Sequence, residues 1–455
     1  MFGQLLSLVI CSLLVLPSST LALVVNRAVS GFPDPLVDSF YSQPDNISSY
    51  SLGQIIAQRS TVSTFTGAST NLYKSYQLKF RSQNSQDEPI AAITTVLVPK
   101  TKTLTGGVPN MLSFQNFEDS VSFSCSPSWA YVANSGSQAA LLANLEAPIV
   151  NGWALNQGYY VVIPDHEGPT SSFIAGRNAG HIVLDSIRAA IKAESLSSKT
   201  RIGMYGYSGG ANAGVFASSL APGYAPELNV VGVSLGGTPV SPKDTFYFLN
   251  GGGASGLAGA GAVGLASAHP EAKAYLDSIL TAEGNATFAK LTADGTCVNT
   301  VTSSEFSNVN YFDLVSPKQD FLGAAPISKA LALETVIQAE ASYTVPVPTH
   351  PVLMYHALTD ELVPFNSSQA YVDEQCKKGA DIRRVIFLLG EHITTEILGI
   401  PSALDFLGKA FAGTLSNVIC GTTIPKIDLG TSASTKIVGS ANDKALQSQA
   451  SAASS

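Results

Sequence analysis

The chain has 455 residues, of which 45% are hydrophobic and 13% charged, and its formal net charge at pH 7 is −8. This much apolar sequence can bury a large core, which excludes a disordered or fibrous protein. No long run of lysine or arginine accompanies the negative charge, and this argues against nucleic acid as a partner, because nucleic acids are bound through clustered cations.

The chain begins with an apolar stretch of signal-peptide length, MFGQLLSLVICSLLVLPSSTLA. Small residues follow Pro17 and end at Ala22, as a cleavage region would, so residues 1–22 predict a secreted, extracellular protein. A membrane anchor is the weaker interpretation, because the run is shorter than a membrane span and Pro17 interrupts it.

Apolar runs of strand length recur after the signal peptide. They are YQLKF, AAITTVLVP, NMLSF, YYVVIP, IGMYGY, VVGVSL, PVLMYH and RVIFLL, which begin at residues 76, 91, 110, 159, 202, 230, 351 and 384. The first part is rich in strands, and helical patterns such as His181–Ala193 and Ser368–Lys378 then alternate with strands. Because the runs are apolar on both faces, we expect a doubly wound α/β fold with a mostly parallel sheet between helices. Its core is predicted over residues 23–240 and 346–429.

The stretch RIGMYGYSGGANAG, residues 201–214, places Ser208 between a predicted strand and a predicted helix. Gly206-Tyr207-Ser208-Gly209-Gly210 matches the G-x-S-x-G nucleophile elbow, in which glycines make room for a strained turn. The backbone N–H of Gly209 begins the next helix and is predicted to stabilise an oxyanion. The stretch has no lysine, which excludes a phosphate-binding P-loop, and a glycine-rich turn without chemistry is the alternative.

A serine nucleophile needs a histidine base oriented by a carboxylate, and in this fold the three follow the order Ser, acid, His along the chain. His392 comes just after the strand at 384 and before a helix, which suits the base. Asp360, in the turn after the strand at 351, is the predicted acid. His350 and His356 are interpreted as structural, since one precedes a proline in a turn and the other lies inside a strand.

A second oxyanion donor is expected from the loop after the strand at 110, which lacks the HGGG form of many esterases. The backbone N–H of Asp119 is the candidate, and a surface turn is the alternative. Asp165 and His166 follow the strand at 159 but precede Ser208, against the required order, so they are interpreted as residues that shape a loop.

The segment between the strands at 230 and 351 is far longer than an ordinary connection, and residues 241–345 are predicted to form a mainly helical cap. The glycine- and alanine-rich run from Gly251 has too little side-chain bulk for a stable membrane helix. It predicts closely packed or mobile segments of the cap. The end of the chain, residues 430–455, is rich in serine and alanine, and is expected to be a flexible tail or flap outside the packed core.

Removal of residues 1–22 takes Cys11 away and leaves four cysteines, Cys125, Cys297, Cys376 and Cys420. An even number in an oxidising compartment predicts two disulfides, and of the three possible pairings we favour Cys125 with Cys297 and Cys376 with Cys420, although spacing does not decide it. Without close CxxC pairs, no metal site is predicted. The Asn-x-Ser/Thr triplets at Asn46, Asn285 and Asn366 are predicted glycosylation sites, although such triplets also arise by chance.

Four stretches in order, GYSGG at 206, HALTDELVPF at 356, GEHITTEI at 390 and VICGTTIPKI at 418, resemble the fungal secretory lipase family of the Candida lipase A type. The resemblance implies an α/β-hydrolase core with a large cap, a triad on Ser208, Asp360 and His392, and an oxyanion hole at Asp119 and Gly209. It also implies an acyl-binding tunnel in the cap and the disulfide pairing favoured above. The run from Gly251 and the tail after Gly430 match the family least well.

The predicted function is that of a secreted serine lipase, which hydrolyses triacylglycerol and related lipid esters at an oil–water interface through an acyl-enzyme on Ser208. No metal or organic cofactor, no nucleic acid and no stable membrane span are expected, and we expect a monomer. A carboxylesterase or acyltransferase acting on shorter or other esters is the enzymatic alternative. A noncatalytic lipid-binding protein on a hydrolase scaffold is the alternative from another class.

Overall fold

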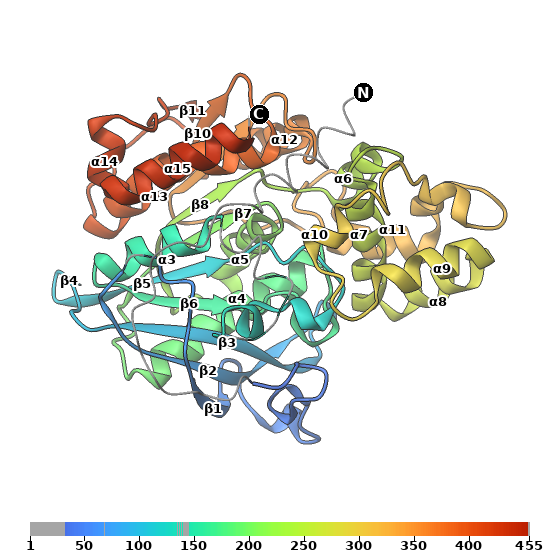
Figure 1. Cartoon of the computed structure of the whole chain (residues 1–455), viewed down its shortest axis with the longest axis horizontal. Helices are drawn as coiled ribbons and strands as arrows, with labels where there is room; N and C mark the ends of the chain where they lie inside the picture. Colours follow the sequence, from blue (N-terminus) through green and yellow to red (C-terminus); the bar gives the residue numbers. More distant parts are fainter. Residues whose placement is uncertain are drawn as a thin grey trace.

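The structure is a computed structural model that describes residues 32–67, 69–133, 135, 137, 139 and 145–453 (Figure 1). The predicted signal peptide lies outside the described residues.

One sheet runs through the molecule in the order β1-β2-β3-β6-β5-β7-β8-β9-β10-β11, with β4 paired to β5 at the side. β1, β2, β3 and β6 pair with one another antiparallel, and every pair from β6 to β11 along this order is parallel. The strands are β1 (Ile55–Thr61), β2 (Leu72–Gln83), β3 (Pro89–Pro99), β4 (Leu104–Thr105), β5 (Val108–Gln115), β6 (Tyr160–Pro164), β7 (Arg201–Tyr207), β8 (Asn229–Gly236), β9 (Val352–Ala357), β10 (Ile382–Phe387) and β11 (Thr422–Thr423).

Helices cover both faces of the sheet. One face, here the α4 face, carries α4 (Gly176–Ala193), α5 (Gly209–Tyr224) and α12 (Phe365–Lys377). The other, the α13 face, carries α2 (Pro127–Ala130), α3 (Ala147–Asn156), α13 (His392–Ala412), α14 (Ser432–Val438) and α15 (Ser440–Ala453). Short 3-10 helices lie at Ser39–Tyr41, Ile47–Ser49, Phe123–Cys125, Gly168–Thr170, Tyr311–Leu314 and Phe321–Gly323.

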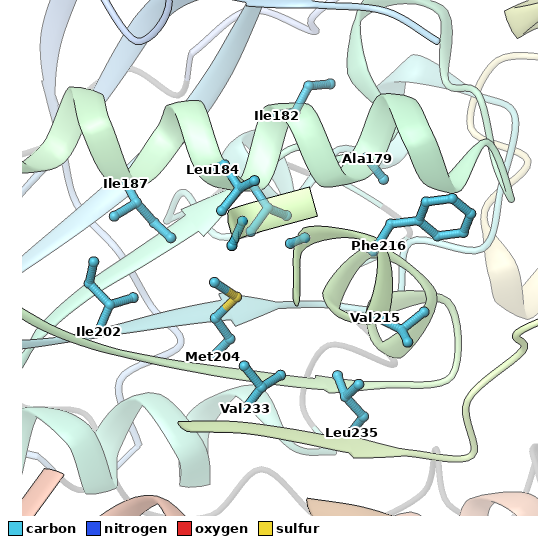
Figure 2. Packing of buried hydrophobic residues seen from close by; sticks show 14 of the residues in the cluster. Ala179, Ile182, Leu184, Ile187, Ile202, Met204, Val215, Phe216, Val233 and Leu235 are labelled. Carbon is cyan, nitrogen blue, oxygen red and sulfur yellow. The ribbon is translucent and has the colours of Figure 1, made fainter. Parts of the chain in front are cut away.

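Alternate residues of the central strands enter two different hydrophobic clusters. On β7, Ile202 and Met204 pack toward the α4 face, whereas Tyr205 and Tyr207 belong to the cluster on the α13 face. Figure 2 shows the first cluster, in which Leu184 of α4 points toward the side chains of β7 and β8. Both faces of the strands are therefore apolar, which is why the sequence reads as continuous apolar runs rather than as an alternating pattern.

The predicted α/β fold is confirmed, and each of the eight predicted strands overlaps an observed one. β1, β4 and β11 were not predicted. β1 has the sequence IIAQRST, is only partly buried and has β2 as its one partner in the sheet, so it gives no apolar run that the pattern could reveal. β4 and β11 are only two residues long.

A helical lobe lies at one side of the sheet, to the right in Figure 1. It contains α6 (Pro242–Leu249), α7 (Ser255–Ala268), α8 (Pro270–Ile279), α9 (Ala282–Leu291), α10 (Val298–Val301) and α11 (Ala325–Leu333). These helices pack around a third hydrophobic cluster, to which Phe117, Leu145 and Phe173 of the core also contribute. A disulfide from Cys125 to Cys297 joins the lobe to the loop after β5, and a second joins Cys376 of α12 to Cys420 before β11. These are the two pairings favoured from the sequence.

The glycine-rich run forms α7, which packs closely against its surroundings. A Cβ atom on Gly256 would lie 1.9 Å from the carbonyl oxygen of Val301, and one on Gly264 would lie 2.3 Å from that of Phe173. Glycine is thus required where backbones approach each other, as expected for the closely packed alternative. Among the described residues, no helix combines the length and the apolar character that crossing a membrane requires.

The expectation that residues 430–455 lie outside the packed core is wrong for the part that is described. α14 and α15 fold back onto α13, and Val438, Leu446 and Ala453 are buried in the cluster on the α13 face. Leu446 and Ala453 are seven residues apart and so lie on one face of α15, an arrangement that composition alone does not reveal.

We predict that Leu446→Ala lowers the free energy of unfolding by about 2–5 kcal/mol, because it leaves a cavity beside α13. The matched control is Ser448→Ala on the exposed side of α15, expected within about 0.5 kcal/mol of the wild type. Denaturant unfolding measures both. Equal stability of the two variants would mean that α15 does not contribute to the core.

Candidate active site

The loops that follow β7, β9 and β10 meet at one edge of the sheet. The parallel register pairs Tyr207 with Gly236 and Gly236 with Tyr355, so the strands end side by side. Ser208 follows β7, Asp360 follows β9 and His392 follows β10. Backbone and side-chain hydrogen bonds join the last two loops, with Thr359 Oγ1 donating to the Gly390 carbonyl at 2.9 Å. The fold thus gathers the three predicted triad residues at one place.

Ser208 occupies a strained turn between β7 and α5. Its φ of 52° and ψ of −123° are unusual for a residue with a side chain. A Cβ on Gly206 would lie 2.4 Å from the Gly210 carbonyl oxygen, and one on Gly210 would lie 2.1 Å from that of Gln115. Both glycines are therefore required sterically, as predicted for a nucleophile elbow.

Asp360 and His392 form a buried hydrogen-bonded pair. Asp360 Oδ2 lies 2.8 Å from His392 Nδ1, and Asp360 Oδ1 accepts hydrogen bonds from the backbone N–H groups of Leu362 and Val363. Burial raises the pKa of Asp360, but the charge of His392 and hydrogen bonds from His392 and His356 outweigh burial and hold the pKa well below its usual range. The acid is therefore ionised.

The imidazole of His392 is fixed from several directions. Its backbone N–H donates to Glu361, its carbonyl accepts from the Tyr207 hydroxyl at 2.5 Å, and its ring centroid lies 4.9 Å from that of Tyr207. Burial lowers the pKa of His392, but the charge and hydrogen bond of Asp360, with the charges of Glu361 and Glu396, overcome burial and raise this pKa to about 9. Tyr207, predicted only as part of the elbow, thus also holds the histidine.

Within the described residues, Nε2 of His392 is buried and has no hydrogen-bond partner. The hydroxyl of Ser208 instead faces the carboxyl group of Asp119, which lowers the pKa of that group. Catalytic hydrogen bonds are often long or unmade in the absence of substrate, so this arrangement is compatible with a serine–histidine pair that closes on the substrate.

Asp119 reaches the site with its side chain as well as its backbone. It has a positive φ of 47°, and burial raises its pKa to about 7, opposed by the charge of His392 and the Ser208 hydrogen bond. Its backbone N–H, the predicted oxyanion donor, faces the carboxyl group of Glu167. Gly209 is the first residue of α5, where backbone N–H groups lack partners inside the helix.

An apolar cavity opens beside Ser208. The core contributes Asp119, Phe173, Ile174, Ser208, Gly209, Pro239, Leu362 and Val363, and the helical lobe contributes Pro242, Thr245, Phe246, Leu249, Leu257, Ala258, Gly261, Ala262, Leu265, Leu322 and Leu331. A lining that is apolar except beside Ser208 and Asp119 suits a hydrocarbon chain attached to a polar reacting group.

The residues that were predicted to be structural lie as follows. His350 hydrogen-bonds with Ser218, away from the triad. Asp165 accepts hydrogen bonds from Ser128, and His166 contacts the Asn116 carbonyl, so both brace the loop that carries Asp119. His356 is different, because its Nε2 lies 3.1 Å from Asp360 Oδ2. Its position inside a strand gave no sign of this contact.

The glycosylation candidates Asn46, Asn285 and Asn366 are all exposed.

A nucleophile elbow after a central parallel strand, followed by an acid and a histidine from later strands of the same sheet, defines an α/β hydrolase. The chain belongs to the secretory lipase family, whose model matches residues 136–417. The resemblance drawn from four sequence stretches is confirmed, and membership of this family agrees with the secretion predicted from residues 1–22.

Individual proteins resemble most of the chain. Lipase A of Moesziomyces aphidis is 43% identical over 412 residues, which cover 90% of this chain and 88% of that protein. A secreted triacylglycerol lipase of Malassezia globosa is 35% identical over 391 residues, covering 84% and 79%. The X-ray structure of Candida antarctica lipase A in its closed state is 42% identical and matches with a TM-score of 0.88, over 92% of this chain and 96% of that one.

We predict that Asp360→Asn lowers the pKa of His392, because the carboxylate of Asp360 raises that pKa in the wild type. The same change lowers kcat by about 10⁴-fold, because His392 is no longer held in the correct tautomer. An NMR titration of the histidine ring measures the pKa without relying on activity. Asp185→Asn, which changes a buried carboxyl group bonded to Ser82, is the control and leaves the His392 titration unchanged. An unaltered titration in folded Asp360→Asn would exclude this role of Asp360.

Proposed function

We propose that this secretory lipase hydrolyses triacylglycerol and related lipid esters through an acyl-enzyme on Ser208. The observation that carries the proposal is the buried Asp360–His392 hydrogen bond beside a serine held at a strained turn, all next to an apolar cavity. In this proposal Ser208 is the nucleophile, His392 the general base and acid, and Asp360 the group that orients the histidine.

The first half of the reaction transfers the acyl group. Ser208 Oγ attacks the ester carbonyl carbon while His392 Nε2 takes the hydroxyl proton, which gives a tetrahedral intermediate. The bond from this carbon to the alkoxy oxygen then breaks, and His392 returns the proton to the leaving alcohol. Because Asp360 holds Nδ1 protonated, Nε2 is the nitrogen that accepts the proton.

The second half uses water in place of the serine hydroxyl. Water attacks the acyl-enzyme carbonyl and gives a proton to His392. The bond from the carbonyl carbon to Ser208 Oγ then breaks while His392 returns the proton to Oγ, which frees the fatty acid and restores Ser208. Gly209, at the N-terminus of α5, is the first donor to the oxyanion. The second is the backbone N–H of Asp119, which faces Glu167 and must turn toward the substrate.

The apolar cavity favours an acyl chain over a peptide or a sugar. α6 and α7 of the lobe, predicted as a cap, line the cavity and so would exclude water from the acyl chain. The substrate is thus proposed to be a lipid ester taken from an oil–water interface, by a monomer. A carboxylesterase acting on short soluble esters shares the triad but needs no such cavity.

We predict that Ser208→Ala loses at least about 10³-fold of the activity on tributyrin and triolein emulsions, because no other nucleophile stands in the turn. Wild type is expected to form an adduct with a serine-directed phosphonate, which peptide mass spectrometry places on Ser208. Thr245→Ser, a conservative change in the cavity wall, serves as the control and stays reactive.

Two results would overturn parts of the proposal. Full activity of Ser208→Ala, or absence of a phosphonate adduct in an inactive wild type, would exclude the serine mechanism and favour a noncatalytic lipid-binding protein. If the enzyme hydrolyses soluble short esters but no emulsion of any chain length, the serine mechanism holds and the enzyme is a carboxylesterase instead of a lipase.

A further inference from the structure

A second histidine touches the acid of the triad. His356 is on β9, four residues before Asp360, and both side chains are buried. His356 Nε2 lies 3.1 Å from Asp360 Oδ2 and 3.2 Å from the carbonyl oxygen of Val363. Oδ2 therefore has two imidazole neighbours, His356 and His392, and the proposed mechanism uses only one of them.

The two partners of His356 determine which of its nitrogens carries a proton. An ionised carboxylate and a backbone carbonyl can only accept hydrogen bonds, so Nε2 must carry the proton, which it donates to the Val363 carbonyl while lying beside Asp360 Oδ2. Nδ1 is buried and has no hydrogen-bond partner among the described residues. An imidazole protonated on Nε2 alone satisfies this arrangement, because Nδ1 then carries no hydrogen that would need an acceptor.

This N–H group adds to the donors around Asp360. Oδ1 accepts from the N–H groups of Leu362 and Val363, Oδ2 accepts from His392, and His356 Nε2 lies 3.1 Å from the same oxygen. A buried carboxylate is stabilised by donors that face its charged form, and each donor also restricts its rotation. Because His356 also bonds the Val363 carbonyl, it holds the carboxylate and the end of the turn in one fixed relation.

We propose that His356 is a positioning residue, which holds Asp360 Oδ2 in line with His392 Nδ1 through its Nε2–H group. The proposal rests on the proposed triad. Without this donor the carboxylate loses one of the groups that restrain Oδ2 and is less able to orient the imidazole, so the chemical step slows while the cavity that binds the acyl chain is unchanged. His356 acts through Asp360 and does not touch the substrate.

The test compares His356→Gln with His356→Leu on a soluble short ester. Glutamine can place an N–H donor near the position of Nε2, whereas leucine has a similar bulk and no donor. We expect His356→Leu to lose about ten- to hundredfold in kcat with KM little changed, and His356→Gln to recover most of the loss. His350→Gln and His350→Leu are the matched controls, because His350 is equally buried and bonds Ser218 instead of the triad.

A spectroscopic signal separates positioning from packing. The proton between His392 and Asp360 gives a low-field NMR resonance, which we expect to shift or broaden in His356→Leu and to return in His356→Gln. Neither His350 variant is expected to change it. Long-range proton–nitrogen spectra of the wild type report the tautomer of His356 directly and do not depend on whether any variant folds.

Three results would overturn the proposal. They are an Nδ1–H tautomer of His356 in the wild type, wild-type kcat and resonance in His356→Leu, or equal losses in the leucine and glutamine variants. Failure of the triad itself is distinguishable, because the wild type would then form no phosphonate adduct on Ser208. If the wild type forms the adduct and any of these three results is obtained, the positioning role of His356 is excluded and the proposed function is unaffected.

Discussion

The stabilisation of one buried negative charge, that of Asp360, is the interaction on which the site depends. Several other carboxyl groups are buried nearby, and burial raises the pKa of Asp119 to about 7 and that of Glu396 to about 8. Asp360 differs because two imidazoles and two backbone N–H groups face it. The geometry therefore favours the ionised form at this one position, and the ionised group is the one that can hold His392 for proton transfer.

The parallel strands supply this geometry. Adjacent parallel strands end at the same edge, so residues that follow β7, β9 and β10 come together although they are far apart in the sequence. The loops after β9 and β10 are then joined by the hydrogen bonds of Thr359 with Gly390 and of Leu358 with Phe387. A short loop on a rigid edge can hold Asp360 against His392 more precisely than a long connection could.

The parts of the fold that could be predicted from the sequence are those governed by local rules. Strands buried on both faces give continuous apolar runs, and the glycines around Ser208 mark a turn that leaves no room for side chains. The order of the triad types follows from strand order, so Asp360 and His392 could be chosen without coordinates. The resemblance to a known family supports the favoured disulfide pairing, which spacing alone leaves open.

The remaining features depend on contacts that cannot be deduced from the distance between two residues in the sequence. His356 and Asp360 are close in sequence, but whether a strand residue and a turn residue meet is decided by how the turn closes. The composition of α15 is mostly polar, yet Leu446 is buried against α13.

The proposed oxyanion donor at Asp119 shows the same limit. Sequence reasoning could name Asp119 but could not reveal that the carboxyl group of Glu167, from the loop after β6, faces its backbone N–H. Buried donors are costly to leave without partners, because an unpaired N–H group away from water loses its hydrogen bond. In the proposed mechanism, the developing oxyanion of an ester competes with the Glu167 carboxyl group for the backbone N–H of Asp119, while the Ser208 hydroxyl turns from the Asp119 carboxyl group to His392. The contacts of the free enzyme would then be exchanged for those that stabilise the transition state, which is how binding of the ester is coupled to its reaction in this proposal.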